Sequence, residues 1–314
     1  MAAHESLNKV TANIGKVIVG KENIIELILT AILAEGHVLM EDVPGTGKTR
    51  LAKALAASLD ANFSRIQFTP DLLPSDITGL NVYDQSRSDF VLRKGPVFTN
   101  ILLADEINRA TPRTQAGLLE CMEEKQVTID GMTHEMSEPF FVIATQNPVE
   151  TSGTFPLPEA QMDRFVMKLS MGLPDAGEEL SILAAYMDKD PLVDLQSVMT
   201  MDELMELRQQ ASKVYVHKDV QKYLVDIVHK TREKGKTLMG VSPRGSLAML
   251  RCMKAYAFLQ GRDYCIPDDV KKLAVPVFAH RIVMNYGYSR PGEAEQFVNN
   301  ILNEITVPTE DFTK

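Results

Sequence analysis

The stretch EDVPGTGKT (Glu41–Thr49) contains the residue types of a loop that binds phosphate groups. Such a loop needs successive backbone N–H groups turned toward one anion, a helix N-terminus behind them and a lysine for the outer phosphates. Gly45, Gly47 and Lys48 meet these needs, and the Thr49 hydroxyl is a group that ligates Mg²⁺ in such loops. The stretch therefore predicts a site for a nucleotide phosphate chain.

Asp42 departs from the usual phosphate-loop pattern, which has its first glycine at this position. Aspartate is among the non-glycine residues that best tolerate unusual backbone angles, and its side chain bonds neighbouring backbone groups. A second anion facing the phosphates would repel them, so we expect the Asp42 carboxylate to point away from them. The departure is therefore compatible with nucleotide binding.

Two adjacent carboxylates, Asp105 and Glu106, end the apolar run ILLADE. Ligands of a parallel sheet bind at the carboxyl ends of its strands, where these acids would lie. Phosphoryl transfer needs a positioned nucleophile and charge compensation. We expect Asp105 to hold Mg²⁺ beside Thr49, and Glu106 to polarise the attacking water. The alternative, a pair of exposed strand-end acids, is disfavoured by the phosphate loop earlier in the chain.

Three further polar residues each allow two interpretations. Asn147, before Pro148, either orients the water or contacts the γ-phosphate, or simply begins a turn. Arg164, beside Asp163, either completes another subunit's phosphate pocket or forms a surface ion pair. Arg244 is either a phosphate contact or a solvated charge at a helix start. The residues alone leave these alternatives open.

Short apolar runs supply the strands that would position these groups. The runs at His37–Asp42, Ile101–Glu106 and Phe140–Asn147 are nearly all apolar, as in central strands of a parallel sheet covered on both faces. Phe165–Ser170 is a weaker candidate, and a helical pattern over Arg50–Asp60 follows the phosphate loop. Strands that alternate with helices predict an α/β fold in which helices flank a parallel sheet.

The pattern changes after MGLPDAG (Met171–Gly177), where strand-like runs stop and helical periodicity continues. We expect an α/β domain at residues 1–172 and an all-α domain at residues 173–314. Ser242 and Pro243 form a typical helix start. The expected helices of the second domain are Glu178–Asp188, Asp202–Ser212, Lys218–Glu233, Arg244–Gln260, Asp268–Val283 and Glu293–Ile305.

The composition excludes several function classes. A chain of 314 residues with 45% hydrophobic residues is globular, and a formal charge of −9 argues against general binding to a nucleic-acid backbone. The three cysteines lack metal-ligand spacing, which indicates buried thiols in a reducing compartment. No apolar run approaches the length needed to cross a bilayer. We therefore expect a cytoplasmic protein without membrane insertion.

The order of these motifs resembles that of AAA+ ATPases, most closely the MoxR group, over nearly the whole chain. DVPGTGKT resembles the Walker A loop, LLADEINRA the Walker B motif, and VIVGKE the segment beside the adenine. Asn147 resembles sensor 1, Arg164 the arginine finger and Arg244 sensor 2. The resemblance implies a P-loop AAA+ domain with a helical lid that hydrolyses ATP with Mg²⁺. The nucleotide contacts that it implies are Val19, Gly20, Pro44, Gly45, Thr46, Gly47, Lys48, Thr49 and Arg50.

Two segments resemble inserts of this family. Thr78–Phe98 alternates like a hairpin and resembles the helix-2 insert, and Lys125–Met136 has a turn at Asp130 and Gly131 and resembles the hairpin before sensor 1. Members with both inserts include MoxR proteins, magnesium chelatase motor subunits and replicative helicases. The resemblance implies a homo-hexameric ring whose loops face a central pore or a partner.

Three functions remain to be compared. The first is a chaperone-like ATPase that remodels or matures protein partners, which the resemblance associates with von Willebrand factor A domains. The second is a nucleic-acid motor, which Asp130 and Glu135 in the second hairpin disfavour because only Lys125 lies nearby to bind phosphate. The third is a nucleotide-gated scaffold, disfavoured because every expected catalytic residue is present. We therefore expect protein clients.

Overall fold

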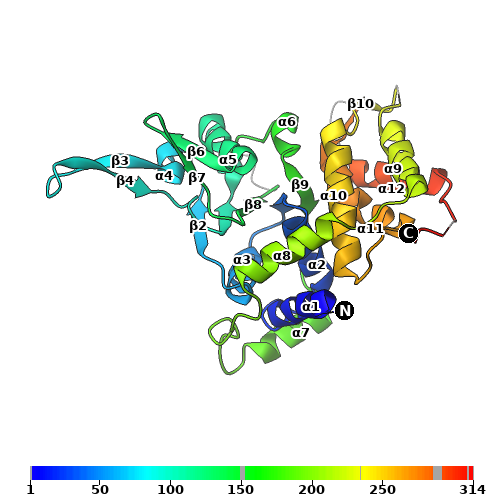
Figure 1. Ribbon diagram of the computed structural model, residues 1–314, viewed down its shortest axis with the longest axis horizontal. Coiled ribbons are helices and arrows are strands. Elements are labelled where there is room, and N and C mark those ends of the chain that lie inside the picture. The colour runs from blue at the N-terminus through cyan, green and yellow to red at the C-terminus, as the bar shows by residue number, and fades with distance from the viewer. Residues whose placement is uncertain (1, 149–152, 234, 286–291, 310, 314) are drawn as a thin grey trace.

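A five-stranded parallel sheet lies at the centre of the molecule (Figure 1), a computed structural model that describes residues 2–148, 153–233, 235–285, 292–309 and 311–313. The strand order is β2 (Phe63–Gln67), β5 (Ile101–Asp105), β8 (Phe141–Gln146), β1 (His37–Glu41) and β9 (Phe165–Leu169). Every neighbouring pair in this order is parallel. The α/β prediction is confirmed, and the four expected strands end within two residues of their predicted bounds.

The central strands β1, β5 and β8 are buried along their length and become partly accessible only at their last residues, Glu41, Asp105 and Gln146. Both faces of these strands are covered, which explains their nearly continuous apolar sequences. Because the strands are parallel, their polar last residues meet at one edge of the sheet. This edge carries the candidate site.

Helices cover the sheet, and two hairpins project from it (Figure 1). The helices of this part are α1 (Ala2–Gly15), α2 (Glu22–Leu33), α3 (Lys48–Ser58), α4 (Pro74–Thr78), α5 (Pro112–Glu124) and α6 (Glu159–Met162). One hairpin pairs β3 (Gly79–Asp84) with β4 (Asp89–Lys94), and the other pairs β6 (Gln126–Ile129) with β7 (Met132–Glu135). Asp130 and Gly131 form the tip of the second hairpin with φ of 49° and 81°, as a tight turn of this kind requires.

The remainder is mostly helical, as predicted, with α7 (Ala176–Ala185), α8 (Met201–Ser212), α9 (Lys218–Thr231), α10 (Pro243–Leu259), α11 (Pro267–Phe278) and α12 (Glu293–Glu304). Ser242 caps α10 by accepting a hydrogen bond from the N–H of Gly245. The helix predicted to run to Val283 ends at Phe278, because Pro276 cannot donate a backbone hydrogen bond and a short 3₁₀ turn follows.

The prediction of a purely α-helical second domain was wrong in one detail. β10 (Thr237–Met239) pairs antiparallel with β11 (Val283–Met284). Strands of three and two residues are too short to produce an alternating sequence pattern.

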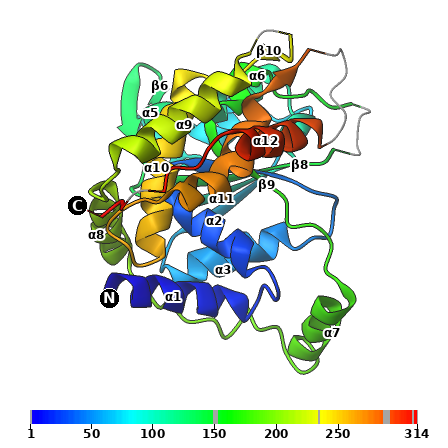
Figure 2. The ribbon, with the colours of Figure 1, turned by 90° about the vertical axis from the view of Figure 1, so that its right-hand side faces the viewer.

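One apolar core joins the sheet and the second helical layer. Figure 2 shows α2 lying between α3 and the helices α10 and α11. Ile32 of α2, Leu51 of α3, Met249 of α10 and Leu273 of α11 belong to the same buried cluster. Arg208 of α8 adds a buried hydrogen bond of 2.9 Å from its Nε to the carbonyl of Ile32.

The cysteines lie inside the fold. Cys121, Cys252 and Cys265 are free and buried, as predicted, and burial raises the pKa of each thiol to about 12. Among the residues that the structure describes, no helix is both long and apolar enough to span a bilayer.

Candidate functional site

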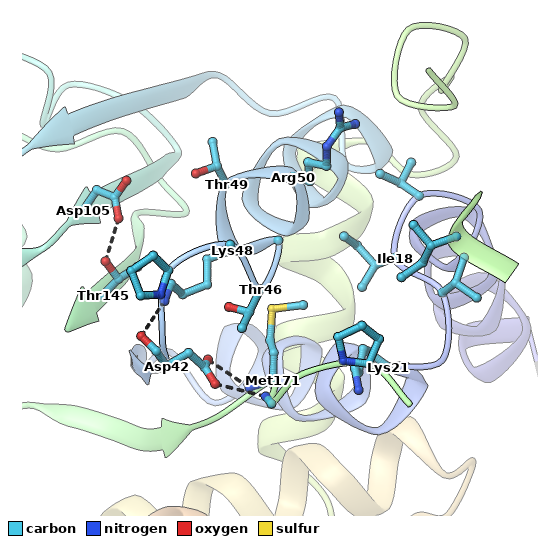
Figure 3. Close-up of a pocket in the computed structure, with 18 of the residues that line it drawn as sticks. Ile18, Lys21, Asp42, Thr46, Lys48, Thr49, Arg50, Asp105, Thr145 and Met171 are labelled. Atoms are coloured by element: carbon cyan, nitrogen blue, oxygen red, sulfur yellow. Dashed lines mark hydrogen bonds between the residues drawn. The ribbon is translucent and has the colours of Figure 1, made fainter. Parts of the chain in front are cut away.

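A cavity of about 570 Å³ opens at the carboxyl edge of the sheet (Figure 3). The phosphate loop forms one side, the ends of β5 and β8 form another, and α7 closes a third. Its volume lies in the range of small-molecule sites. Of the residues expected to contact a nucleotide, the cavity is lined by Val19, Pro44, Gly45, Thr46, Gly47, Lys48, Thr49, Arg50, Asp105, Glu106 and Asn147.

The phosphate loop adopts positive φ angles at two of its glycines. Gly45 and Gly47 have φ of 89° and 94°, which a residue with a side chain rarely adopts. A Cβ at Gly45 would meet nothing within 4 Å, so this glycine is required by its backbone angle and not by lack of space. Lys48 begins α3, so the loop leads directly into a helix N-terminus. Its Nζ donates to the carbonyls of Asp42 (3.0 Å) and Val43 (3.2 Å).

Asp42 fastens the start of this loop to the chain that follows β9. Its carboxylate accepts hydrogen bonds from Ser170 Oγ at 2.6 Å, Met171 N at 2.9 Å and Gly172 N at 3.0 Å. Both carboxylate oxygens are engaged by this segment, while Lys48 contacts only the backbone carbonyl of Asp42. Figure 3 shows the Asp42 carboxylate beside Met171. The reason given for tolerating aspartate was wrong, since Asp42 is not among the positive-φ residues of the described chain. Its role is to accept hydrogen bonds.

Asp105 is held by groups from both neighbouring strands. Its Oδ1 accepts a 2.7 Å hydrogen bond from the hydroxyl of Thr145 on β8, and its Oδ2 forms a 2.6 Å ion pair with Arg65 on β2. Thr145 and Asp105 face each other in Figure 3. The side chain of Asp105 is 14% exposed, so it is sheltered and still reachable from the cavity.

Glu106 adopts a left-handed backbone conformation with φ of 56°. This conformation is uncommon outside glycine and often marks functional sites. The N–H of Glu106 donates to Thr145 Oγ1 at 2.8 Å, so one threonine positions both acids. The Glu106 carboxylate accepts from Gln67 Nε2 at 2.7 Å and pairs with Arg109 at 3.0 Å. Both contacts are made to Oε2, so Gln67 and Arg109 together fix the orientation of this carboxylate.

Apolar side chains form the far side of the cavity. Val17, Ile18 and Val19 line the cavity together with Ile182 of α7 and Tyr186, which directly follows that helix. This apolar lining suits a flat heterocycle such as a nucleotide base. Arg50 forms a 2.8 Å ion pair with Asp190, and its guanidinium lies 4.6 Å from the ring centroid of Tyr186.

Gly20 is the predicted nucleotide contact that falls outside this cavity lining, as far as the described residues go. Its φ is 74°, and a Cβ there would come within 2.5 Å of the Glu178 carboxylate. The adjacent Lys21 lines the cavity and pairs with Glu178 at 2.8 Å. Gly20 thus lets the chain turn so that Lys21 can tie this segment to α7.

Arg164 and Arg244 lie elsewhere, and neither is among the described residues that line the cavity. Both pair with Glu123 near the end of α5: Arg164 Nη2 lies 3.1 Å from Oε2, and Arg244 Nη2 lies 3.2 Å from Oε1. Arg164 follows α6, and Arg244 lies in the first turn of α10. In Figure 1, α6 and the start of α10 are at the end of the molecule opposite α7. The two arginines are therefore together, but away from the chain's own cavity.

The backbone beside these arginines is fixed by a buried ion pair. Arg281, whose side chain is 2% exposed, donates from Nε to Asp163 at 2.6 Å and also bonds the carbonyl of Phe165. Ser242 Oγ donates to the same aspartate at 3.1 Å. Burial lowers the pKa of Arg281, and the Asp163 carboxylate opposes this effect. Asp163, which directly precedes Arg164, is thus bonded to Ser242, the N-cap of the helix that carries Arg244.

Several residues of the site were missed by sequence reasoning. Thr145 lies two positions before Asn147, and its position at a strand end was the signal that could have found it. Arg65 and Gln67 alternate along β2 and contact the two acids only because β2 lies beside β5. No local sequence pattern identifies Glu123 as a site residue, since its partners Arg164 and Arg244 come from segments far along the chain.

Two family models match the chain. The ATPase family associated with various cellular activities (AAA) matches residues 37–167, and the AAA lid domain matches residues 229–305. The chain is 48% identical to the uncharacterized protein YeaC of Bacillus subtilis, over 98% of this chain and 96% of that protein. It is 39% identical to Chaperone MoxR1 of Mycobacterium tuberculosis, over 96% and 82% of the two chains.

Further relatives agree with these. Protein MoxR of Paracoccus denitrificans is 31% identical, over 93% of this chain and 92% of that protein. A solved structure of a candidate ATPase from Cytophaga hutchinsonii matches with a TM-score of 0.88 and 39% identity, over 98% and 96% of the two chains. With the phosphate loop, the two strand-end acids and the helical lid in place, the chain belongs to the MoxR group of AAA+ ATPases.

Proposed function

We propose that the protein is an Mg²⁺-dependent ATP hydrolase that remodels or matures protein partners in the manner of a chaperone. The observation that carries the proposal is the convergence of Lys48, Thr49, Asp105, Glu106 and Asn147 on one cavity. These groups supply an anion site, a metal site and a water-orienting carboxylate, which are the parts that phosphoryl transfer requires. The naming of one relative as a chaperone supports the protein-directed role.

The donor set fits Mg²⁺. Thr49 and Asp105 both line the cavity and offer oxygen atoms, and Mg²⁺ is usually held by one or two such groups together with phosphate oxygens and waters. Bound Mg²⁺ would neutralise charge on the phosphates. Lys48 would bind the outer phosphates, and Asn147 would contact the γ-phosphate or the water. Glu106, oriented by Gln67 and Arg109 through its Oε2, would polarise that water.

The proposed assembly is a homo-hexameric ring in which Arg164 and Arg244 act on the nucleotide of the next subunit. Their separation from their own cavity supports this arrangement. Arginine supplied by a neighbour can stabilise charge that spreads over the γ-phosphoryl oxygens. Isolated subunits should then be poor enzymes, and activity per subunit should rise with protein concentration.

The projecting hairpin favours a protein client over nucleic acid. Leu80, Val82, Tyr83 and Phe90 are exposed on β3 and β4, and the rings of Tyr83 and Phe90 pack edge to face with centroids 5.4 Å apart. Exposed apolar groups of this kind mark contact surfaces for proteins. Of the basic residues on the same hairpin, Arg87 pairs with Asp84. The partner that we propose carries a von Willebrand factor A domain, as the resemblance to MoxR proteins implies.

The test uses Glu106→Gln to hold ATP in the site. Loss of the water-orienting carboxylate should slow hydrolysis by about 100-fold or more while ATP binding is retained. The variant is then used to capture a purified partner with a von Willebrand factor A domain, in ATP and in ADP. Glu106→Gln combined with Lys48→Ala is the matched control, because it lacks the lysine needed to bind phosphate.

Capture in ATP that is lost in ADP and in the control supports the proposal. An unchanged hydrolysis rate in Glu106→Gln would instead indicate a nucleotide-gated scaffold. Recovery of nucleic acid in place of the protein partner would favour a nucleic-acid motor.

A further inference from the structure

We infer that Glu123 is a positioning residue that gathers Arg164 and Arg244 into one anion-binding site for the triphosphate of the adjacent subunit. The inference rests on the proposed function, and it adds a residue that does not touch the nucleotide. Each oxygen of this carboxylate holds a different arginine, at 3.1 Å and 3.2 Å. The arginines come from opposite sides of the expected domain boundary, so Glu123 joins the α/β domain to the lid.

The charge balance of the cluster points to a ligand. Two cations are brought together by one carboxylate, which leaves an excess positive charge on an accessible surface. The exposed fractions of the side chains are 30% for Arg164, 43% for Arg244 and 36% for Glu123. Ion pairs this exposed contribute little to folding stability. The cluster is therefore poorly explained as a device for holding the domains together, a task that the buried pair of Asp163 and Arg281 already performs.

Arginine geometry lets Glu123 position the pair without blocking it. The closest contact of each arginine to Glu123 is made through a terminal nitrogen, Nη2. A guanidinium presents five N–H donors in a fixed fork, so the remaining donors can meet phosphate oxygens while Glu123 holds the side chain. The carboxylate also reduces the repulsion between the two guanidinium groups, which would otherwise separate.

Glu123 also lies where a movement of the second hairpin would reach the arginines. It is in the last turn of α5, two residues before Lys125, which caps that helix. The carbonyl of Lys125 accepts a 2.9 Å hydrogen bond from the N–H of Met136, which closes the base of the hairpin formed by β6 and β7. A partner that displaces this hairpin would therefore move Glu123 and change the separation of the two arginines.

The first experiment compares ATP hydrolysis by Glu123→Gln and by Glu124→Gln. Glu124 is the exposed neighbour on the same helix, so its substitution removes the same charge without the arginine contacts. We expect kcat of Glu123→Gln to fall about 10-fold to 100-fold, the effect of a displaced catalytic group, with little change in Glu124→Gln. Binding of a fluorescent ATP analogue to subunits diluted until they are separate should be unchanged in both variants, since Glu123 does not line the cavity of its own subunit. A wild-type rate in Glu123→Gln overturns the inference.

The second experiment separates positioning from a structural role. Glu123→Gln retains an intact cavity, and Lys48→Ala retains correctly placed arginines. In a mixed ring, the cavity of a Glu123→Gln subunit can therefore meet the arginines of a neighbouring Lys48→Ala subunit and form an active interface. We expect the mixture to hydrolyse ATP several-fold faster than the sum of the two variants alone. The mixture of Arg164→Ala and Lys48→Ala is the control for the proposed function itself.

The outcomes of the two mixtures are distinguishable. Recovery of activity in both supports the inference. Recovery with Arg164→Ala but not with Glu123→Gln shows that Glu123 is needed for the cavity of its own subunit and not for positioning the arginines, which overturns the inference while the proposed function stands. Recovery in neither refutes the arginine action between subunits on which both depend.

Discussion

Replacing Asp42 with glycine would restore the usual phosphate-loop pattern, yet the structure predicts a less stable protein. Three hydrogen bonds to the carboxylate would be lost, from Ser170 Oγ, Met171 N and Gly172 N. The Ser170 hydroxyl can turn to another acceptor, and Gly172 is exposed, so water can satisfy its N–H. Met171 is 6% exposed, and its N–H would be left buried without a partner.

The magnitude follows from these three environments. A buried unsatisfied N–H costs about 1–3 kcal/mol. The added backbone freedom of glycine costs roughly 0.5–1 kcal/mol more. We therefore expect Asp42→Gly to lower the free energy of unfolding by about 3 kcal/mol, and Asp42→Asn, which keeps one oxygen acceptor, by roughly half as much. Met171 and Gly172 line the cavity, so ATP affinity should be equal or weaker in both variants.

The assay is urea unfolding of the two variants and the wild type, with titration of a fluorescent ATP analogue on the same samples. The order of stability should be wild type, then Asp42→Asn, then Asp42→Gly. An Asp42→Gly protein that is as stable as wild type and binds the analogue far more tightly would refute the reasoning, because the carboxylate would then be a repulsive neighbour of the phosphates.

Three more predictions follow from single contacts. Burial lowers the pKa of His37 from 6.5 to about 4, so the unfolded state binds the proton first and stability is lost as pH falls below about 6.5. Urea unfolding at pH 7 and pH 5 should show a drop to which His37 contributes about 2 kcal/mol, and burial of His280, which also lowers its pKa, adds a loss of the same sign. The drop should be smaller by about 2 kcal/mol in His37→Gln, and equal drops would contradict this. Arg281→Met leaves Asp163 without its ion-pair partner and should destabilise by about 3 kcal/mol, partly recovered by adding Asp163→Asn, whereas additive losses would exclude coupling. Lys48→Ala should abolish binding of the ATP analogue in titration with unchanged stability, and retained tight binding would show that the loop is not the phosphate site.

Local patterns in the sequence were enough to predict four of the five strands and the phosphate loop, but not β2, whose sequence FSRIQ is neither continuously apolar nor continuously buried. Strands such as Phe141–Gln146 are buried on both faces, so an apolar run and its polar end are adjacent in sequence. The same reasoning located Asp105 and Glu106, because a strand end determines where their side chains project. The hydrogen-bond partners of Asp42 lie about 130 residues further along the chain, so local sequence could not predict them.

Contacts between distant segments could not be predicted in this way. Gln67 reaches Glu106 only because β2 and β5 are neighbours in the sheet, and strand order is not encoded in local periodicity. The meeting of Arg164 and Arg244 at Glu123 depends on how the lid docks, which is a property of the whole fold. The left-handed conformation of Glu106 likewise depends on Thr145, which receives its N–H.

The continuous apolar core determines how cooperatively the molecule unfolds. Because Ile32 and Met249 share one cluster, the proposed boundary between residues 172 and 173 divides the sequence without dividing the core. The two parts should melt in a single cooperative transition, since neither can lose its packing without exposing the other. A chain truncated at residue 172 would present the apolar face of α2 to water and should aggregate. Any movement during the proposed ATP turnover would then be confined to segments outside this core, such as α7, where no described residue is buried.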